Sequence, residues 1–135
     1  MPPQRRTPLE LTEALLRAHR TQDWDYLRTL FHPDAKIGVF ATGGAPEDPE
    51  RAIQAMRQAH TDGVYSATAD RISLLDDDVV MLEGFVRYRV PDGGIAFVER
   101  VWLYVIVDGL LHRSAMFKTQ NDARAALQSG RRLGA

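Results

Sequence analysis

The chain opens with a stretch in which inward-facing residues recur at the spacing of a helix, from Pro8 to about Thr21. The positions that would share one buried face are Leu11, Leu15, Ala18 and His19. The preceding segment, Thr7-Pro8-Leu9-Glu10, provides a capping box and places a proline at the first helical position. The pattern therefore predicts an amphipathic first helix.

Two further helices are predicted after it. Asp23 is suited to cap a short second helix, and Pro33 is expected to end it, because proline disfavours helical backbone at the residue before it. The apolar stripe of this helix consists of Trp24, Leu27, Leu30 and Phe31. After a short strand at Ala35–Phe40, Asp48-Pro49 opens a third helix that runs to about His60.

The second half of the chain has the pattern of four strands joined by short turns at 76–78, 91–94 and 108–109, followed by a last helix at Asp122–Gln128. Early helices and a later meander predict an α+β fold, in which a curved antiparallel sheet wraps around the N-terminal helices and encloses a cone-shaped cavity. We expect one domain over residues 1–135, with a core at about 8–128 and loose tails at 1–6 and 130–135.

The turn Pro91-Asp92-Gly93-Gly94 suggests how two long strands pair. If Pro91 pairs with Gly94, residue 102 lies opposite residue 83, and residue 100 opposite residue 85. One face then holds Met81, Glu83, Phe85, Arg87, Val98, Arg100, Trp102 and Tyr104. The other face holds Val80, Leu82, Val86, Tyr88, Val101, Leu103 and Val105. Both faces are largely apolar, so we expect the sheet to be covered on both sides.

Composition excludes several classes of function. Apolar residues make up 44% of the chain, which is enough to build a core. A formal net charge of −1 gives no reason to expect nucleic acid or a membrane as a partner. Without cysteine there is no disulfide, thiolate metal site or cysteine nucleophile. The polar N-terminus and the absence of an apolar run of about 18 residues predict a cytoplasmic protein.

Three segments resemble the nuclear transport factor 2-like superfamily, whose members are also described as SnoaL-like or cystatin-like α+β cones. They are TQDWDYLRTLFHPDA at 21–35, PERAIQAMRQAH at 49–60 and VDGLLHRSAMF at 107–117. The resemblance covers residues from about 8 to 127. It implies that the sheet face with Trp102 lines the cone, joined by Leu111, Arg113, Ala115 and Phe117 of the next strand. It also implies a homodimer through the outer sheet face, because a large exposed apolar surface is otherwise a liability.

The catalytic residues known from this superfamily do not carry over. The positions that match those of its steroid isomerases fall on Leu15, Val39 and near Trp102, none of which can transfer a proton as required. The histidine of SnoaL-like dehydratases falls near Tyr65, and the Asp-Arg-Asp set of limonene epoxide hydrolase has no match. Both an enzymatic and a non-catalytic use of the cavity therefore stay open.

The resemblance places charged groups among aromatic side chains in the cavity. His19 and Glu83 are the candidates for catalytic proton transfer, and Glu83 is expected to pair with Arg100 or Arg113, since an unpaired buried charge is costly. The candidate ligand-binding residues are Leu15, Tyr26, Met56, Phe85, Arg100, Trp102, Tyr104, Arg113 and Phe117. Neither a metal site nor a cofactor is expected, because no element carries histidines and carboxylates at ligand spacing.

Two functions are consistent with these features. The first is a protein that binds a small apolar or amphipathic molecule with a polar or anionic group, with lyase, isomerase or hydrolase chemistry left open. The second is a non-catalytic dimerisation or scaffolding module. The module predicts a filled or very small cone, with Glu83 and the arginines locked in pairs. A cavity of about 300 Å³ or more would argue against it.

Overall fold

A computed structural model describes residues 6–38, 46–62 and 65–130. Most of the predicted tails, at 1–5 and 131–135, and the end of the predicted first strand, at 39–40, lie outside these residues. The elements in chain order are α1 (Pro8–Arg20), α2 (Trp24–Thr29), β1 (Phe31–Ile37), α3 (Pro49–Asp62), β2 (Tyr65–Asp76), β3 (Val79–Arg89), β4 (Ile95–Val107), β5 (Leu110–Phe117) and α4 (Gln120–Gly130).

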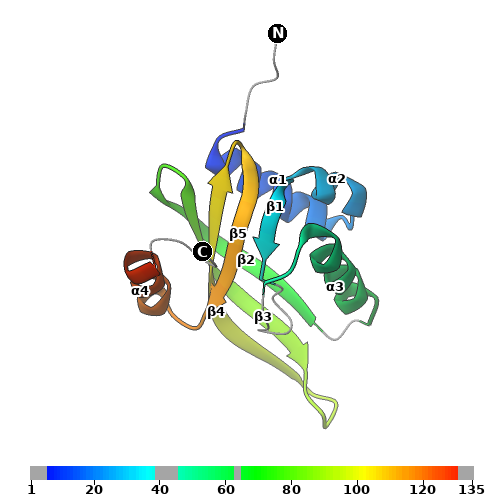
Figure 1. Cartoon of the computed structure of the whole chain (residues 1–135). Helices are drawn as coiled ribbons and strands as arrows, with labels where there is room; N and C mark the ends of the chain where they lie inside the picture. The colour runs from blue at the N-terminus through cyan, green and yellow to red at the C-terminus, as the bar shows by residue number, and fades with distance from the viewer. Residues whose placement is uncertain (1–5, 39–45, 63–64, 131–135) are drawn as a thin grey trace.

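The five strands form one curved sheet in the order β1-β5-β4-β3-β2. Helices α1, α2 and α3 lie on one side of the sheet, and α4 lies on the other (Figure 1). This arrangement confirms the predicted α+β class. The sheet is mixed rather than wholly antiparallel, because β1 pairs with β5 in parallel while the other neighbours are antiparallel.

Local capping chemistry fixes the first two helices as the sequence predicts. The Thr7 hydroxyl accepts a hydrogen bond from the Glu10 backbone N–H, and the Glu10 carboxylate accepts one from the Thr7 N–H. The Asp23 carboxylate accepts from the backbone N–H of Tyr26 at the start of α2. These bonds satisfy N–H groups that have no partner within the helix.

The predicted end of α2 was wrong. The helix stops at Thr29 and β1 begins at Phe31, so Pro33 lies inside a strand. The backbone N–H of Leu111 donates to the Leu30 oxygen, at 2.9 Å, which draws the segment to β5. Proline is tolerated there because β1 is an edge strand and its pairing with β5 is irregular between Phe31 and Lys36.

The predicted pairing of β3 with β4 was wrong by one residue. Trp102 lies opposite Leu82, and Arg100 lies opposite Gly84. The hairpin closes between Val90 and Gly94 through a three-residue loop, in which Gly93 adopts a left-handed φ of 94°. Because side chains alternate along a strand, this shift moves every β3 residue to the face opposite the one predicted.

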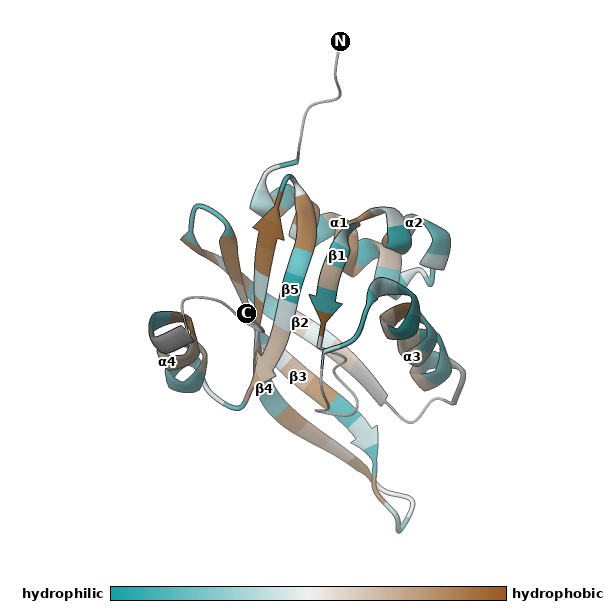
Figure 2. Cartoon of the chain, viewed as in Figure 1, coloured by the Kyte–Doolittle hydropathy of each residue, from teal (hydrophilic) through white to brown (hydrophobic). Residues whose placement is uncertain are grey.

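Each face of the sheet has its own apolar core. Toward α1, α2 and α3, the buried strand residues include Val80, Leu82, Trp102, Tyr104 and Ile106. Under α4, the buried residues are Val79, Met81, Val101, Leu103 and Ala123. The hydropathy colouring accordingly shows hydrophobic segments along β4 (Figure 2). In the described part of the chain, the helices are too short or too polar to cross a membrane.

Candidate functional site

A largely apolar cavity of about 50 Å³ lies between the N-terminal helices and the concave face of the sheet. The described lining residues are Leu15, Leu16, His19, Leu27, Phe31, Ile37, Met56, Ala67, Ala69, Leu82, Trp102, Tyr104, Leu111 and Ser114. All three N-terminal helices and all five strands contribute, so the cavity is the place where the elements of the fold converge.

Tyr104 brings a polar atom into this apolar setting. Its side chain is only 5% exposed, and burial raises the pKa of its hydroxyl above the ordinary value, so the phenol stays protonated at neutral pH. Within the part of the chain that the structure describes, no group hydrogen-bonds this hydroxyl. Buried tyrosine hydroxyls usually have a partner, so this one is available to a molecule in the cavity.

His19 lies on α1 and presents an uncharged ring to the cavity. Burial lowers its pKa to about 4, with a smaller contribution from electrostatic repulsion by His60, so the His19 imidazole is neutral at pH 7. Its ring packs edge-on against Trp24 of α2, at 5.7 Å between centroids, and at a tilt of 53° against His60 of α3, at 5.6 Å. Trp24 and His60 are 5.8 Å apart, so three rings join the three N-terminal helices beside the cavity.

Ser114 is the third polar side chain of the lining, and it already has partners. Its hydroxyl oxygen accepts from the Gly38 backbone N–H at 3.1 Å, and the hydroxyl also lies 3.5 Å from the Gly38 oxygen. These contacts tie β5 to the end of β1. The polar groups that remain for a ligand therefore come chiefly from Tyr104 and His19.

Solved structures with the same arrangement of elements identify the fold. TerC, crystallised with polyporic acid, superposes with a TM-score of 0.66 at 17% identity over 90% of this chain and 98% of its own. An NTF2-like protein of unknown function from Burkholderia pseudomallei gives 0.67 at 10% identity, over 87% and 95%. This chain has the nuclear transport factor 2-like fold.

A third structure with this fold contains a ligand. Rv0760c from Mycobacterium tuberculosis, in complex with estradiol-17β-hemisuccinate, has a TM-score of 0.65 at 16% identity, over 86% of this chain and 97% of its own. The chain matches no protein-family model and no curated protein sequence. At these identities the likeness establishes the nuclear transport factor 2-like fold and leaves ligand and activity to the site itself.

The nuclear transport factor 2-like fold brings five of the candidate residues to the cavity. Leu15 and His19 come from α1, Met56 from α3, and Trp102 and Tyr104 from β4. Trp102 and Tyr104 are two residues apart on β4, so their side chains share one face of the sheet. This holds whatever the register of the neighbouring strand.

Three candidates lie on the opposite, outer face of the sheet. Glu83 and Phe85 changed faces with the shifted pairing of β3 and β4, and Phe117 packs in the core under α4. On β5 the residues opposite Trp102 and Tyr104 are Met116 and Ser114. The sequence had predicted Arg113, Ala115 and Phe117 on that face, so the pairing differs by one position. Glu83 therefore lies on the far side of the sheet from the cavity.

The remaining three candidates also lie outside the cavity. Arg100 donates from Nη1 to the backbone oxygen of Glu99 at 2.8 Å. Arg113 donates from Nη1 to the backbone oxygens of His112 and Asp34, so neither arginine forms the predicted pair with Glu83. Tyr26 is exposed on α2, where its hydroxyl accepts a hydrogen bond from Arg6.

Sequence reasoning did not assign most of the small and apolar lining residues to the cavity. They are Leu16, Leu27, Phe31, Ile37, Ala67, Ala69, Leu82 and Ser114, whereas Leu111 was expected on the cone face and does line the cavity. Leu27 and Phe31 were assigned to the core by their apolar spacing, and the correct strand pairing would have placed Leu82 opposite Trp102. No local motif distinguishes Ala67 or Ala69, whose small side chains leave space for the cavity.

Proposed function

We propose that the protein binds a small, uncharged, mostly apolar molecule that carries one hydrogen-bond-accepting oxygen. The observation that carries the proposal is the buried Tyr104 hydroxyl, which lines the cavity and is bonded to no described group. A carbonyl oxygen of a ligand would satisfy this donor and recover the cost of leaving it unpaired. The steroid ester bound by Rv0760c, which has the same fold, supports a ligand of this general kind.

The charge state of the lining excludes a charged ligand from the proposal. The ring of His19 is neutral at pH 7, and the described lining contains no arginine, lysine, aspartate or glutamate. An ionised group brought into this cavity would lose its hydration without gaining an opposite charge. The anionic group considered from the sequence depended on Arg100 and Arg113, which lie elsewhere.

The volume of the cavity limits the size of the ligand that the present side-chain arrangement accepts. About 50 Å³ holds a few water-sized groups, whereas ligand sites usually measure about 300 Å³ or more. We propose that binding enlarges the cavity by rotation of Met56 and Leu16, since an unbranched methionine side chain repacks readily. A reaction of the lyase, isomerase or hydrolase type would have His19 as its proton acceptor, because Glu83 lies on the other face.

Titration with three compounds of nearly equal size tests this function. Acetophenone has the ketone oxygen, ethylbenzene lacks it, and benzoate replaces it with a charge. We expect backbone amide shifts to report cavity binding in the order acetophenone, ethylbenzene, benzoate. Tyr104→Phe should weaken acetophenone about fivefold to tenfold, the value of one hydrogen bond, and leave ethylbenzene unchanged. Equal weakening of both compounds would mean that the hydroxyl has no role in binding.

We also propose a homodimer through the outer sheet face. The small cavity favours this proposal, because a dimerisation module was expected to have a filled or very small cone. Helix α4 covers only part of this face. On the projecting β3–β4 hairpin (Figure 1), Phe85, Ile95 and Phe97 share the outer face and are 39%, 53% and 67% exposed. Water-exposed apolar side chains grouped in this way are typical of an interface.

Sedimentation equilibrium tests the dimer. We expect a dimer for the unmodified chain and a weaker one for Phe97→Ser, because an exposed phenylalanine would lose its contacts with the second copy. Tyr88→Ser is the matched control, since Tyr88 is 38% exposed on the opposite side of the same hairpin. A monomer at every concentration, or equal dissociation of both variants, would refute this interface.

A further inference from the structure

A second pocket, of about 400 Å³, lies on the outer face of the sheet and is much larger than the cavity. Its described lining comes from β2, β3 and β4 on one side and from the junction of β5 with α4 on the other. This volume falls within the usual range of small-molecule sites. The proposed cavity ligand does not use this pocket, and the proposed dimer interface shares only Phe85 with it.

The pocket is built on an irregular part of the sheet. The pairing of β2 with β3 shifts at Asp70, between Ala69 and Arg71, as in a β-bulge. Gly84 lies opposite Ala69, and a Cβ atom at Gly84 would come within 1.8 Å of the Thr68 backbone oxygen. Bulges and strand glycines redirect side chains and bend strands. Asp70, Arg71 and Gly84 all line the pocket, so its shape follows from this bend.

The Glu83 carboxylate in the pocket already has an ion-pair partner and a hydrogen-bond donor. The Glu83 carboxylate lies 3.6 Å from Nη1 of Arg71 and accepts a hydrogen bond from the side-chain amide of Gln120. Its side chain is largely shielded from water. This arrangement links β2, β3 and the start of α4, and it pairs the shielded Glu83 carboxylate with an arginine that is itself 73% exposed.

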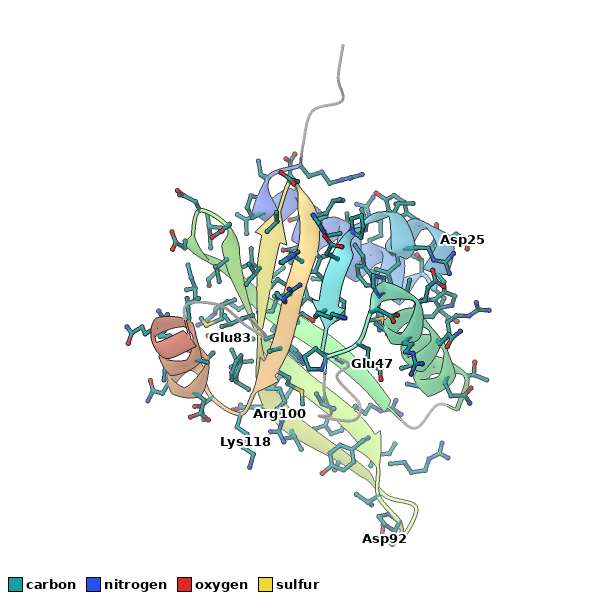
Figure 3. The ribbon with its side chains drawn as sticks, in the orientation of Figure 1. Asp25, Glu47, Glu83, Asp92, Arg100 and Lys118 are labelled. Atoms are coloured by element: carbon teal, nitrogen blue, oxygen red, sulfur yellow. The ribbon has the colours of Figure 1, made fainter. Side chains whose placement is uncertain are left out.

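Two cations in the pocket have no such partner. Among the described residues, no carboxylate forms an ion pair with Arg100 or Lys118, and the recorded bond of the Arg100 side chain goes to the Glu99 backbone oxygen. Both residues line the pocket, and Figure 3 places them with Glu83 in the region beside α4. Arg100 leaves β4 on the same face as Trp102, and it lines the pocket at the edge of β4 beyond Val101 and Phe117, the last pair that β4 forms with β5. Arg100 as a whole is half-buried.

The pocket also contains two other acids and one aromatic side chain. Asp70 and Glu99 line it as exposed, hydrated carboxylates, so the charges of its lining cancel and any attraction acts at short range. Phe85, which is 39% exposed, supplies an apolar surface in the same pocket as Arg100 and Lys118. A ligand that uses all these groups needs an anionic head and an apolar body.

We propose that the outer pocket binds a small molecule in which a carboxylate or phosphate group is attached to an apolar, preferably aromatic, body. The oxyanion contacts Arg100 and Lys118, and the body lies against Phe85. The guanidinium offers paired N–H donors that match the oxygens of either anion. This site is separate from the cavity in both position and ligand charge, so its test does not depend on cavity binding.

Four benzene derivatives test the proposal: benzoate and phenyl phosphate as anions, benzamide as the neutral analogue and benzylammonium as the cation. We expect saturable backbone amide shifts at Gly84, Val101 and Thr119 with one or both anions, and weaker shifts with benzamide and benzylammonium. The difference between the two anions identifies the preferred head group. Raising the salt concentration should weaken anion binding, because the contacts are partly exposed ion pairs.

Substitutions of Arg100 and Lys118 test whether these two cations bind the anionic group. Arg100→Gln and Lys118→Gln should each weaken the preferred anion about tenfold. Arg87→Gln is the control, since Arg87 is an exposed arginine of β3 outside the pocket, and it should leave binding unchanged. Lys118 is exposed, so its variant tests the proposal even if Arg100→Gln does not fold. Lack of saturable anion binding, equal binding of benzylammonium, or equal effects of Lys118→Gln and Arg87→Gln would overturn the proposal.

Discussion

Replacing Gly84 with alanine is expected to lower the free energy of unfolding by about 3 kcal/mol or more. A Cβ atom there would lie 1.8 Å from the oxygen of Thr68, 2.8 Å from its carbonyl carbon and 2.9 Å from Cα of Ala69. All three are backbone atoms of β2, so no side chain can rotate away, and the two strands must separate. Thermal unfolding followed by circular dichroism should show a midpoint lower by roughly 10 °C.

Gly94→Ala is the matched control for this variant. A Cβ atom at Gly94 would meet only the side chains of Asp92 and Val90, each at 3.3 Å, at the exposed end of the β3–β4 hairpin. Those side chains can shift, so the cost should stay below about 1 kcal/mol. Equal unfolding midpoints for the two variants would show that β2 and β3 do not approach as closely at Gly84 as the structure indicates.

Acidification is expected to destabilise the protein through His19. The unfolded state binds a proton at His19 near pH 6.5, whereas burial and electrostatic repulsion by His60 lower the pKa of His19 in the folded state to about 4. The unfolded state therefore holds more protons between these values, and the free energy of unfolding falls as pH drops from about 6.5 to about 4. The loss from this residue levels off below that pH and amounts to about 3 kcal/mol.

Denaturant unfolding at pH 7 and at pH 4.5 measures this loss, with His19→Leu as the informative variant. Leucine cannot be protonated, so the variant should lose less stability on acidification than the unmodified chain. His112→Asn is the control, because burial and the neighbouring Arg113 also lower the pKa of His112, at a half-buried site on β5. If His112→Asn removes more of the pH dependence than His19→Leu, the assignment to His19 is wrong.

The sequence predicted those parts of the fold that depend on local chemistry. The capping groups Thr7 and Asp23 each accept from an N–H group three residues away, so the two helix starts were visible in short stretches of sequence. The end of α2 was not visible in this way, because the transition to β1 depends on a backbone hydrogen bond between Leu30 and Leu111, which are distant in the sequence. Pairing across such distances leaves little trace in the local pattern.

The candidate site was predicted in part for the same reason. Trp102 and Tyr104 are two residues apart on one strand, so the sequence predicted that they share a sheet face without knowledge of the neighbouring strands. The placement of Glu83 and Phe85 depended on the hairpin loop, and two adjacent glycines allow either a two-residue or a three-residue loop. The left-handed Gly93 selects the longer loop, which moved the charged candidate away from the cavity and left neutral groups there.

The location of bound acetophenone tests most directly the claim that the cavity is the ligand site. Intermolecular nuclear Overhauser effects between the compound and the protein measure that location. The account predicts contacts with the methyl groups of Leu15, Met56 and Leu82 and with the ring of Tyr104, from α1, α3, β3 and β4. Contacts only with Phe85, Ile95 or Phe97 on the outer face, or no saturable binding of acetophenone, would contradict it.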